Sequence, residues 1–239
     1  MIRLERAPKP DYLTDEKAQE LTNKYQLDTQ KTVWNRSEIR EPLLESSNNK
    51  CAYCECILQK TDSYCQIEHF HPKSLYPQEV VVWENLLPAC GRCNAPKGNH
   101  DTVNLPIINP YEDIPKEHLS TQGCRLYSKT EIGKMTIKVL NLNDNDRLCI
   151  PRFKLCNEIN EKLGNIKDVT DLLEQRNLLH SLLIACSKSG EFSAFCSHAL
   201  HSNADYIHIK NLLSENGYWY DELAKLDEET KSIALDSRS

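Results

Sequence analysis

Two Cys-x-x-Cys pairs constrain the fold of this chain more than any other feature of its sequence. Cys51 and Cys54 form the first pair, and Cys90 and Cys93 form the second. Each pair has the spacing of a tight knuckle that chelates one cation, and two such pairs supply the four thiolates that structural zinc prefers. We therefore expect one zinc ion bound by these four cysteines, within a loop-rich region that folds around it.

The other cysteines leave alternatives to this ligand set. The chain has 11 cysteines, so short spacings also arise by chance, and buried reduced thiols or disulfides are the alternative to zinc. Cys56 and Cys65 lie close to the first pair in sequence and are alternative ligands. The remaining cysteines have no partner at ligand spacing and are expected to be core thiols.

The length of 239 residues is enough for a hydrophobic core, so zinc would stabilise one region locally and would not replace that core. Residues 1–9 carry charges where a signal peptide needs an apolar run. No stretch of the sequence reaches the roughly 18 apolar residues of a membrane span. We therefore expect a cytoplasmic protein without membrane contact, in which unpaired thiols stay reduced.

The net charge of −6 is unusual for a nucleic-acid enzyme, because attraction to phosphate normally shows as an excess of basic residues. Residues 151–239 carry 10 Lys and Arg against 14 Asp and Glu, a net charge of −4, whereas residues 46–110 carry 5 against 6. This distribution argues against tight autonomous DNA binding and favours a partner protein that brings the substrate. A solvated acidic helical surface is the alternative.

Helical signals precede the cysteine region. Thr14, followed by two acidic residues, predicts an N-capped helix, and a second short helix is expected over residues 37–45. Between residues 50 and 99 the sequence predicts short strands, one of them over 80–83, and then a brief helix that begins near Cys93. Two strands followed by a helix is therefore the expected core.

Proline and glycine without clear periodicity predict a loop over residues 105–133, after which the chain becomes helical. Apolar residues recur at helical spacing from Phe153 to Leu163 with Gly164 as a stop, then over 172–183, and a last helix is expected near 206–213. We therefore expect an α+β fold with four parts, namely an N-terminal helical segment at 1–49, a zinc-bearing core at 50–110, a wrapping loop at 111–135 and a helical region at 136–239.

The residues between the cysteine pairs suit phosphodiester hydrolysis, which requires a base to activate water and a cation to take up charge on the phosphate. His69 can be the base, because an unperturbed imidazole is largely neutral at cellular pH. Glu68 and Asn94 offer oxygen ligands that suit Mg²⁺ or Mn²⁺. The Asn85 amide can bridge backbone groups and so hold the His69 loop in place.

Neighbouring residues leave some of these roles open. His71 would share the strand face of His69, so it is an alternative base or a phosphate contact. Arg92 and Lys97 are candidate phosphate contacts, and ordinary exposed cations are the alternative for both.

This arrangement resembles the HNH, or ββα-metal, endonucleases, in the subset where two Cys-x-x-Cys pairs flank the site. The matching segments are Glu-His-Phe-His-Pro at 68–72, Asn-Leu at 85–86 and Cys-Gly-Arg-Cys-Asn-Ala-Pro-Lys at 90–97. The resemblance implies that His69 is the general base and that Asn85 positions it. It also implies that Glu68 and Asn94 bind the catalytic cation. Glu and Asn stand here in place of the family's commoner Asp and His, and both offer an oxygen donor, which favours a hard cation over a catalytic zinc.

A narrower resemblance covers most of the chain. The segments RLERAPKP at 3–10, CAYCE at 51–55, IEHFHPKS at 67–74 and Leu-Asn-Leu-Asn at 140–143 are similar to the PtuB group, the HNH effectors of Septu-type and retron-linked anti-phage systems. This group implies a PtuA-like ATPase partner and restriction of phage by cutting nucleic acid. The acidic helical region would then be a docking surface for the ATPase complex.

The leading hypothesis is a DNase that leaves 5′-phosphate and 3′-hydroxyl ends. One alternative is a non-catalytic binding module, in which the zinc site only scaffolds a contact with a protein or a nucleic acid. A scaffold does not require an acid, an imidazole and two amides at catalytic spacing, which favours the enzyme. The other alternative is a stand-alone toxin nuclease that works without an ATPase.

Overall fold

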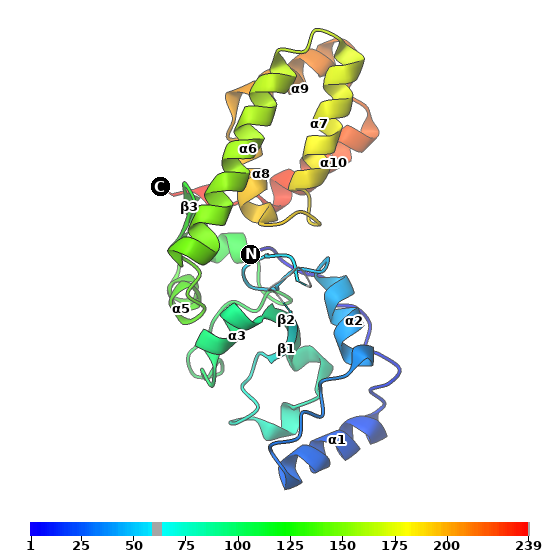
Figure 1. Ribbon diagram of the computed structural model, residues 1–239, viewed down its shortest axis with the longest axis vertical. Helices are drawn as coiled ribbons and strands as arrows, with labels where there is room; N and C mark the ends of the chain where they lie inside the picture. The colour runs from blue at the N-terminus through cyan, green and yellow to red at the C-terminus, as the bar shows by residue number, and fades with distance from the viewer. Residues whose placement is uncertain (59–63, 239) are drawn as a thin grey trace. The chain divides into compact units, whose positions relative to one another are not determined.

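In the computed structural model, which describes residues 1–58 and 64–238, the chain divides into two compact units (Figure 1). The motif unit comprises residues 3–115 and 130–142 and contains both Cys-x-x-Cys pairs. The helical unit comprises residues 1–2, 116–129 and 143–239. In this division the N-terminal helices belong to the same compact unit as the two Cys-x-x-Cys pairs.

Two helices open the motif unit, α1 (Asp15–Leu27) and α2 (Ser37–Ser46). The Thr14 side chain caps α1 by accepting a hydrogen bond from the Lys17 backbone N–H, as its position predicts. Ile39 and Leu43 of α2 are fully buried in a hydrophobic core that also contains Trp83. This packing places the N-terminal segment against the residues that follow the His69 motif.

The centre of the motif unit is an antiparallel hairpin followed directly by a helix. Strand β1 (Cys65–His69) pairs with β2 (Leu86–Cys90), with Cys65 opposite Cys90 and His69 opposite Leu86. Helix α3 (Gly91–Lys97) begins immediately after β2, two residues before the expected start at Cys93. The expected α+β class with two strands and a helix around the cysteines is therefore confirmed.

The apolar run at 80–83 is not a strand, in contrast to the prediction. Short 3₁₀ helices, η1 (Pro77–Glu79) and η2 (Trp83–Asn85), flank this run, and Val80, Val81 and Trp83 are buried. β-Branched and aromatic residues fit any well-packed apolar site, so their clustering here reflects burial of a turn rather than an extended backbone.

The expected loop over 105–133 contains regular structure. It includes α4 (Pro115–His118) and a hairpin of β3 (Leu119–Gln122) and β4 (Arg125–Ser128), and α5 (Glu131–Val139) follows in the motif unit. Gly123 turns the hairpin with a positive φ of 60°, a conformation that favours glycine. The strands are only four residues long, too short for a clear alternating pattern.

The helical unit combines this small sheet with a bundle (Figure 1). Strand β5 (Asp236–Ser237) pairs in parallel with β3. A π-helical turn, η3 (Asn145–Cys149), leads into α6 (Ile150–Lys167), α7 (Leu172–Cys186), α8 (Ser193–His201), α9 (Ala204–Glu215) and α10 (Asp221–Ile233). In the described residues, no helix is both long and apolar enough to cross a membrane.

The bundle differs from the expected helices in three respects. Gly164 lies inside α6 rather than at its end, and Phe153 is 61% exposed although it was expected on the buried stripe. Helices α8 and α10 were not predicted. Helix α8 has only nine residues and α10 is strongly charged, so neither carries a long apolar stripe.

Candidate functional site

The four predicted zinc ligands come together in the motif unit. The Sγ atoms of Cys51, Cys54, Cys90 and Cys93 all lie within 4.8 Å of one another, and all four residues are buried. The Cys54 and Cys90 Sγ atoms are 3.8 Å apart. Four sulfurs bound tetrahedrally at about 2.3 Å from a zinc ion are about 3.8 Å apart. The cluster can therefore hold a structural zinc ion without rearrangement of these two ligands.

The alternative ligands lie outside this four-sulfur group. Cys56 is half-buried beside it, and contacts with Cys51, Cys54 and Cys90 raise the pKa of its thiol. Cys65 is half-buried at the start of β1, where burial raises the pKa of its thiol to about 11. Within the described part of the chain, the predicted four cysteines are the only group of three or more Cys, His, Asp or Glu side chains whose ligand atoms lie close enough to share a metal ion.

Backbone hydrogen bonds hold the first cysteine pair against the hairpin. The Cys51 N–H donates to the Cys56 carbonyl at 2.9 Å, which closes the knuckle. The Ala52 N–H donates to the Pro88 carbonyl of β2, also at 2.9 Å. Glu55 has a positive φ of 67° and lies 3.5 Å from the buried Lys50 ammonium. The knuckle is thus fixed to β2, the strand that ends at the third ligand, Cys90.

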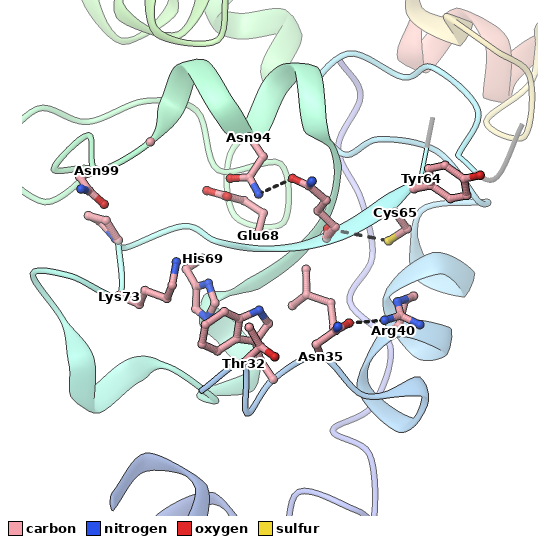
Figure 2. Close-up of a pocket in the computed structure, with 15 residues that line it drawn as sticks. Thr32, Asn35, Arg40, Tyr64, Cys65, Glu68, His69, Lys73, Asn94 and Asn99 are labelled. Atoms are coloured by element: carbon pink, nitrogen blue, oxygen red, sulfur yellow. Dashed lines mark hydrogen bonds between the residues drawn. The ribbon is translucent and has the colours of Figure 1, made fainter. Parts of the chain in front are cut away.

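His69 ends β1 and lines a cavity of about 770 Å³, drawn in Figure 2. The His69 Nε2 atom lies 2.9 Å from the Val80 carbonyl oxygen. A carbonyl can only accept, so Nε2 carries the proton and Nδ1 keeps its lone pair. Burial lowers the pKa of His69 to about 3, partly offset by this hydrogen bond. The imidazole is therefore neutral at cellular pH with its tautomer fixed.

Glu68 lines the same cavity as His69, although neighbouring strand residues normally point to opposite faces. Its carboxylate oxygen Oε1 lies 2.6 Å from the Lys97 ammonium, and both side chains are almost completely buried. Burial raises the pKa of Glu68, and the positive charge of Lys97 opposes this shift. Lys97 thus stabilises the charged form of a carboxylate whose protonation burial favours.

Lys97 differs from its expected role. Its ammonium donates a 2.8 Å hydrogen bond to the His69 carbonyl oxygen in addition to the Glu68 ion pair, and its side chain has no exposed surface. A phosphate cannot reach this group, so we do not retain Lys97 as a phosphate contact. It instead ties the last residue of α3 to the end of β1.

Asn94 projects from α3 into the cavity. Its Nδ2 donates to the Gln66 Oε1 atom at 2.9 Å, which leaves the amide oxygen as an available acceptor. Figure 2 shows Asn94 and Glu68 on the same wall of the cavity, with His69 on the opposite side of β1 in this view. A carboxylate and an amide oxygen at one wall fit the oxygen preference of a hard cation such as Mg²⁺ or Mn²⁺.

Asn85 is buried, and its side chain bonds the backbone at both His71 and Glu79. Its Oδ1 accepts a 2.6 Å hydrogen bond from the His71 N–H. Its Nδ2 donates to the carbonyls of His71 at 3.1 Å and Glu79 at 3.2 Å. The Asn85 carbonyl also accepts from the Phe70 N–H at 2.9 Å. These bonds fix the chain that immediately follows His69.

His71 and Arg92 do not line the cavity. The His71 Nδ1 atom lies 2.7 Å from the Glu79 carboxylate, so its ring is held in a separate pair. Arg92 is exposed on α3. The structure therefore brings His69 rather than His71 to the cavity, and neither His71 nor Arg92 is placed to contact a group bound there.

The structure adds cavity residues that the sequence did not indicate. Trp34, Asn35 and Arg40 come from the N-terminal segment, and Lys73 follows the His-Pro motif. The Trp34 ring meets His69 edge-on, with 4.7 Å between ring centroids. Lys73 directly follows Pro72 of the His-Pro motif, so its position in the sequence could have indicated a place in the site. No sequence motif marks Arg40.

Comparison with known proteins gives three relatives. A protein of Bacillus thuringiensis named Septu protein PtuB is 37% identical over 238 residues, which cover 95% of this chain and 92% of the relative. A Septu protein PtuB of Bacillus mycoides (strain KBAB4) is 31% identical over 164 residues, 54% of this chain and 55% of the relative. Protein ea31 of Escherichia phage lambda is 26% identical over 190 residues, 75% of this chain and 61% of the relative.

No protein-family model matches the chain, and no solved structure matches it significantly. The match to the Bacillus thuringiensis protein extends over both units of the structure, including the cysteine cluster and the His69 cavity. By this identity and coverage, the chain belongs to the PtuB family of Septu proteins.

Proposed function

We propose that this chain is a metal-dependent HNH endonuclease that hydrolyses phosphodiester bonds of DNA. The observation that carries the proposal is the buried, neutral His69 imidazole, whose tautomer is fixed by the Val80 carbonyl and which lines a cavity shared with Glu68 and Asn94. A merely structural histidine needs neither an open cavity beside it nor a paired carboxylate at the next position.

In this mechanism, His69 Nδ1 accepts a proton from a water molecule as the water oxygen attacks phosphorus. The 3′ oxygen leaves, which gives 5′-phosphate and 3′-hydroxyl ends. Burial disfavours the charged imidazolium in the empty cavity. A phosphate anion near the ring raises the pKa of His69 and so increases its capacity to accept the proton. The Val80 carbonyl stabilises the imidazolium through its hydrogen bond to Nε2.

Glu68 and Asn94 would hold the catalytic Mg²⁺ or Mn²⁺, which supplies positive charge for the phosphate and the leaving oxygen. Lys97 keeps Glu68 ionised and ties it to the His69 backbone. Asn85 fixes the loop after the base. The four cysteines would hold a zinc ion that has no part in the chemistry.

The same family membership supports a role in anti-phage defence, in a complex with a PtuA-like ATPase. Two of the three relatives that match this chain are named Septu protein PtuB. Residues 151–239 carry a net charge of −4, with 10 basic and 14 acidic residues, which suits contact with a protein better than contact with DNA. We therefore assign the nuclease role to the motif unit and the docking role to the helical unit.

A cleavage assay on plasmid DNA and on single-stranded DNA, with the parent and His69→Ala, tests the proposed nuclease activity. We expect cleavage to fall about 10²- to 10⁴-fold, because the variant loses its general base. His71→Ala is the matched control, since His71 has its own partner and lies outside the cavity. Zinc content should be the same in both variants and the parent. Equal cutting by the parent and His69→Ala would contradict the nuclease proposal and favour the alternative of a zinc-scaffolded binding module.

A further inference from the structure

The cavity beside His69 has a second wall that the nuclease motif does not supply. Strand β1 and Asn94 of α3 form the first wall. Residues 32–35, between α1 and α2, and Arg40 of α2 form the other, as Figure 2 shows for Thr32, Asn35 and Arg40. The base therefore lies in a cleft rather than on an open face.

Two cations in this cleft contact neutral groups and, among the described residues, have no acid at ion-pair distance, although the charge of Lys73 also opposes the rise in the pKa of Glu68 that burial causes. Lys73 and Arg40 are half-buried, and neither forms an ion pair with any residue in the described ranges 1–58 and 64–238. The Lys73 ammonium lies 5.0 Å from the centroid of the Trp34 ring, and Arg40 donates to the Asn35 amide oxygen. Glu68, the acid in this cleft, is already paired with Lys97. The cleft is therefore locally basic within an acidic chain.

The two cations stand at opposite ends of the cleft. Lys73 is close enough to His69 for its charge to lower the pKa of the imidazole, and Arg40 acts similarly on the Cys65 thiol. Cys65 and His69 are the two ends of β1, which at about 3.4 Å per residue are about 14 Å apart. Figure 2 shows His69 between Lys73 and Arg40 in this view. The strand between the two residues on which these charges act is therefore long enough to run beside more than one nucleotide.

An exposed aromatic ring accompanies the outer cation. Tyr64 lines the cleft near Arg40 with 78% of its surface exposed, so the face of its ring is accessible. A basic groove with an aromatic platform is the combination that binds single-stranded nucleic acid, because bases stack on the ring and phosphates meet the cations.

We propose that this cleft binds a single unpaired DNA strand, with Lys73 and Arg40 contacting phosphates on either side of the bond presented to His69 and with Tyr64 stacking on a base. The inference rests on the proposed nuclease function and names its substrate class. A cavity of about 770 Å³ with walls on two sides is in the size range of small-ligand sites, so it admits a few nucleotides of one strand and not a paired duplex.

The test measures binding to the full-length, zinc-loaded chain carrying His69→Ala, so that the strand stays uncut. Fluorescence anisotropy compares a labelled single-stranded DNA oligonucleotide with the duplex of the same sequence across a salt series. We expect the single strand to bind about tenfold more tightly, since only an unpaired base can stack on Tyr64.

Three substitutions sharpen this test. Arg40→Gln and Lys73→Gln should each weaken single-strand binding about fivefold and make the dependence of log K on log salt shallower by about 0.7 per lost phosphate contact. Tyr64→Leu should weaken binding about tenfold without changing the salt dependence. Lys134→Gln is the matched control, because Lys134 is an exposed cation of α5 outside the cleft, and it should leave binding unchanged.

Duplex binding as tight as single-strand binding would overturn the inference, as would unchanged affinity in Arg40→Gln and Lys73→Gln or no binding of either DNA. Measuring DNA cleavage by the parent chain distinguishes failure of the single-strand inference from failure of the proposed nuclease function. If the parent chain and the Arg40→Gln and Lys73→Gln variants cut duplex DNA equally well, the protein is a nuclease but its substrate is not a single strand bound in this cleft. A parent that binds the single strand as expected but cuts no nucleic acid is a binding protein rather than an enzyme.

Discussion

The two ends of the β1–β2 hairpin are held by different interactions. At one end, Cys90 closes β2 and belongs to the cluster of four buried sulfurs that fits a zinc ion. At the other end, His69 is fixed by the Val80 carbonyl, and Lys97 ties its backbone to Glu68. The hairpin thus connects a cluster suited to a metal with a network of hydrogen bonds and one buried ion pair.

This difference follows from what each end has to do. A metal bound by four thiolates has no open coordination position, so it can stabilise the fold but cannot take part in the reaction. A base needs a free lone pair in an accessible cavity, so its surroundings must fix the ring without binding Nδ1. We therefore expect changes at the cysteine end to act on folding, and changes at the His69 end to act on local stability and chemistry.

The largest effect is expected from Cys90→Ser, which removes one ligand from the cysteine end. Structural zinc contributes on the order of 10 kcal/mol to folding in small zinc domains, so the motif unit should lose zinc and its cooperative thermal transition. Zinc content by metal analysis and a thermal melt followed by circular dichroism measure both losses.

Cys56→Ser is the matched control for the cysteine end, because Cys56 lies beside the cluster but outside the four-sulfur group. It should keep one zinc per chain. Loss of zinc from Cys56→Ser but not from Cys90→Ser would assign the fourth ligand to Cys56 and change the register of the knuckle.

A smaller effect is expected from Lys97→Met at the other end of the hairpin. This change leaves the Glu68 carboxylate buried without its partner, which typically costs about 3–5 kcal/mol of unfolding free energy. Urea denaturation measures the loss, and the zinc content should stay at the parent value because the cysteines are untouched.

The double variant Lys97→Met with Glu68→Gln separates the charge from the packing. It removes both charges of the pair, so it should recover a large part of the stability that Lys97→Met alone loses. If the double variant is as unstable as the sum of the two single variants, the aliphatic part of Lys97 rather than its charge stabilises this end.

The contrast between the two ends also explains what the sequence could predict. The cysteines of each pair stand at the short fixed spacing of metal ligands, so the four-cysteine group, the first strand and the helix that follows the second pair were predictable from local pattern, whereas the second strand was expected at 80–83 instead of 86–90. The spacing of the cysteines indicates the metal site even when the rest of the fold is unknown.

The predictions that differ from the structure depended on contacts distant in sequence. Val80 and Val81 form part of a buried turn, because the N-terminal helices cover them. Lys97 was expected at the surface, and its burial depends on how α3 packs against β1. Arg40 lies 25 residues before the start of β1 at Cys65 and carries no motif, so only the tertiary structure places it in the cleft.

The smallest predicted effect is a pH dependence at the His69 end. The pKa of His69 is lowered to about 3 in the folded protein by burial, whereas an unfolded histidine has a pKa of about 6.5. The folded protein therefore binds fewer protons at this residue between these two pH values. The contribution of His69 to stability is complete above pH 6.5 and is lost as the pH falls towards 3.

His69→Asn removes this titration, because asparagine does not ionise. Relative to this variant, the parent should lose about 1.4 kcal/mol of unfolding free energy between pH 7.5 and pH 5.5. Urea denaturation of both proteins at each pH measures the difference, and acid weakening of the zinc thiolates cancels because both proteins share the cysteine cluster. An equal stability difference at both pH values would mean that the folded imidazole takes up a proton as readily as an exposed one. His69 would then lie in a solvated site, and the contrast between a buried base and a buried metal cluster would no longer hold.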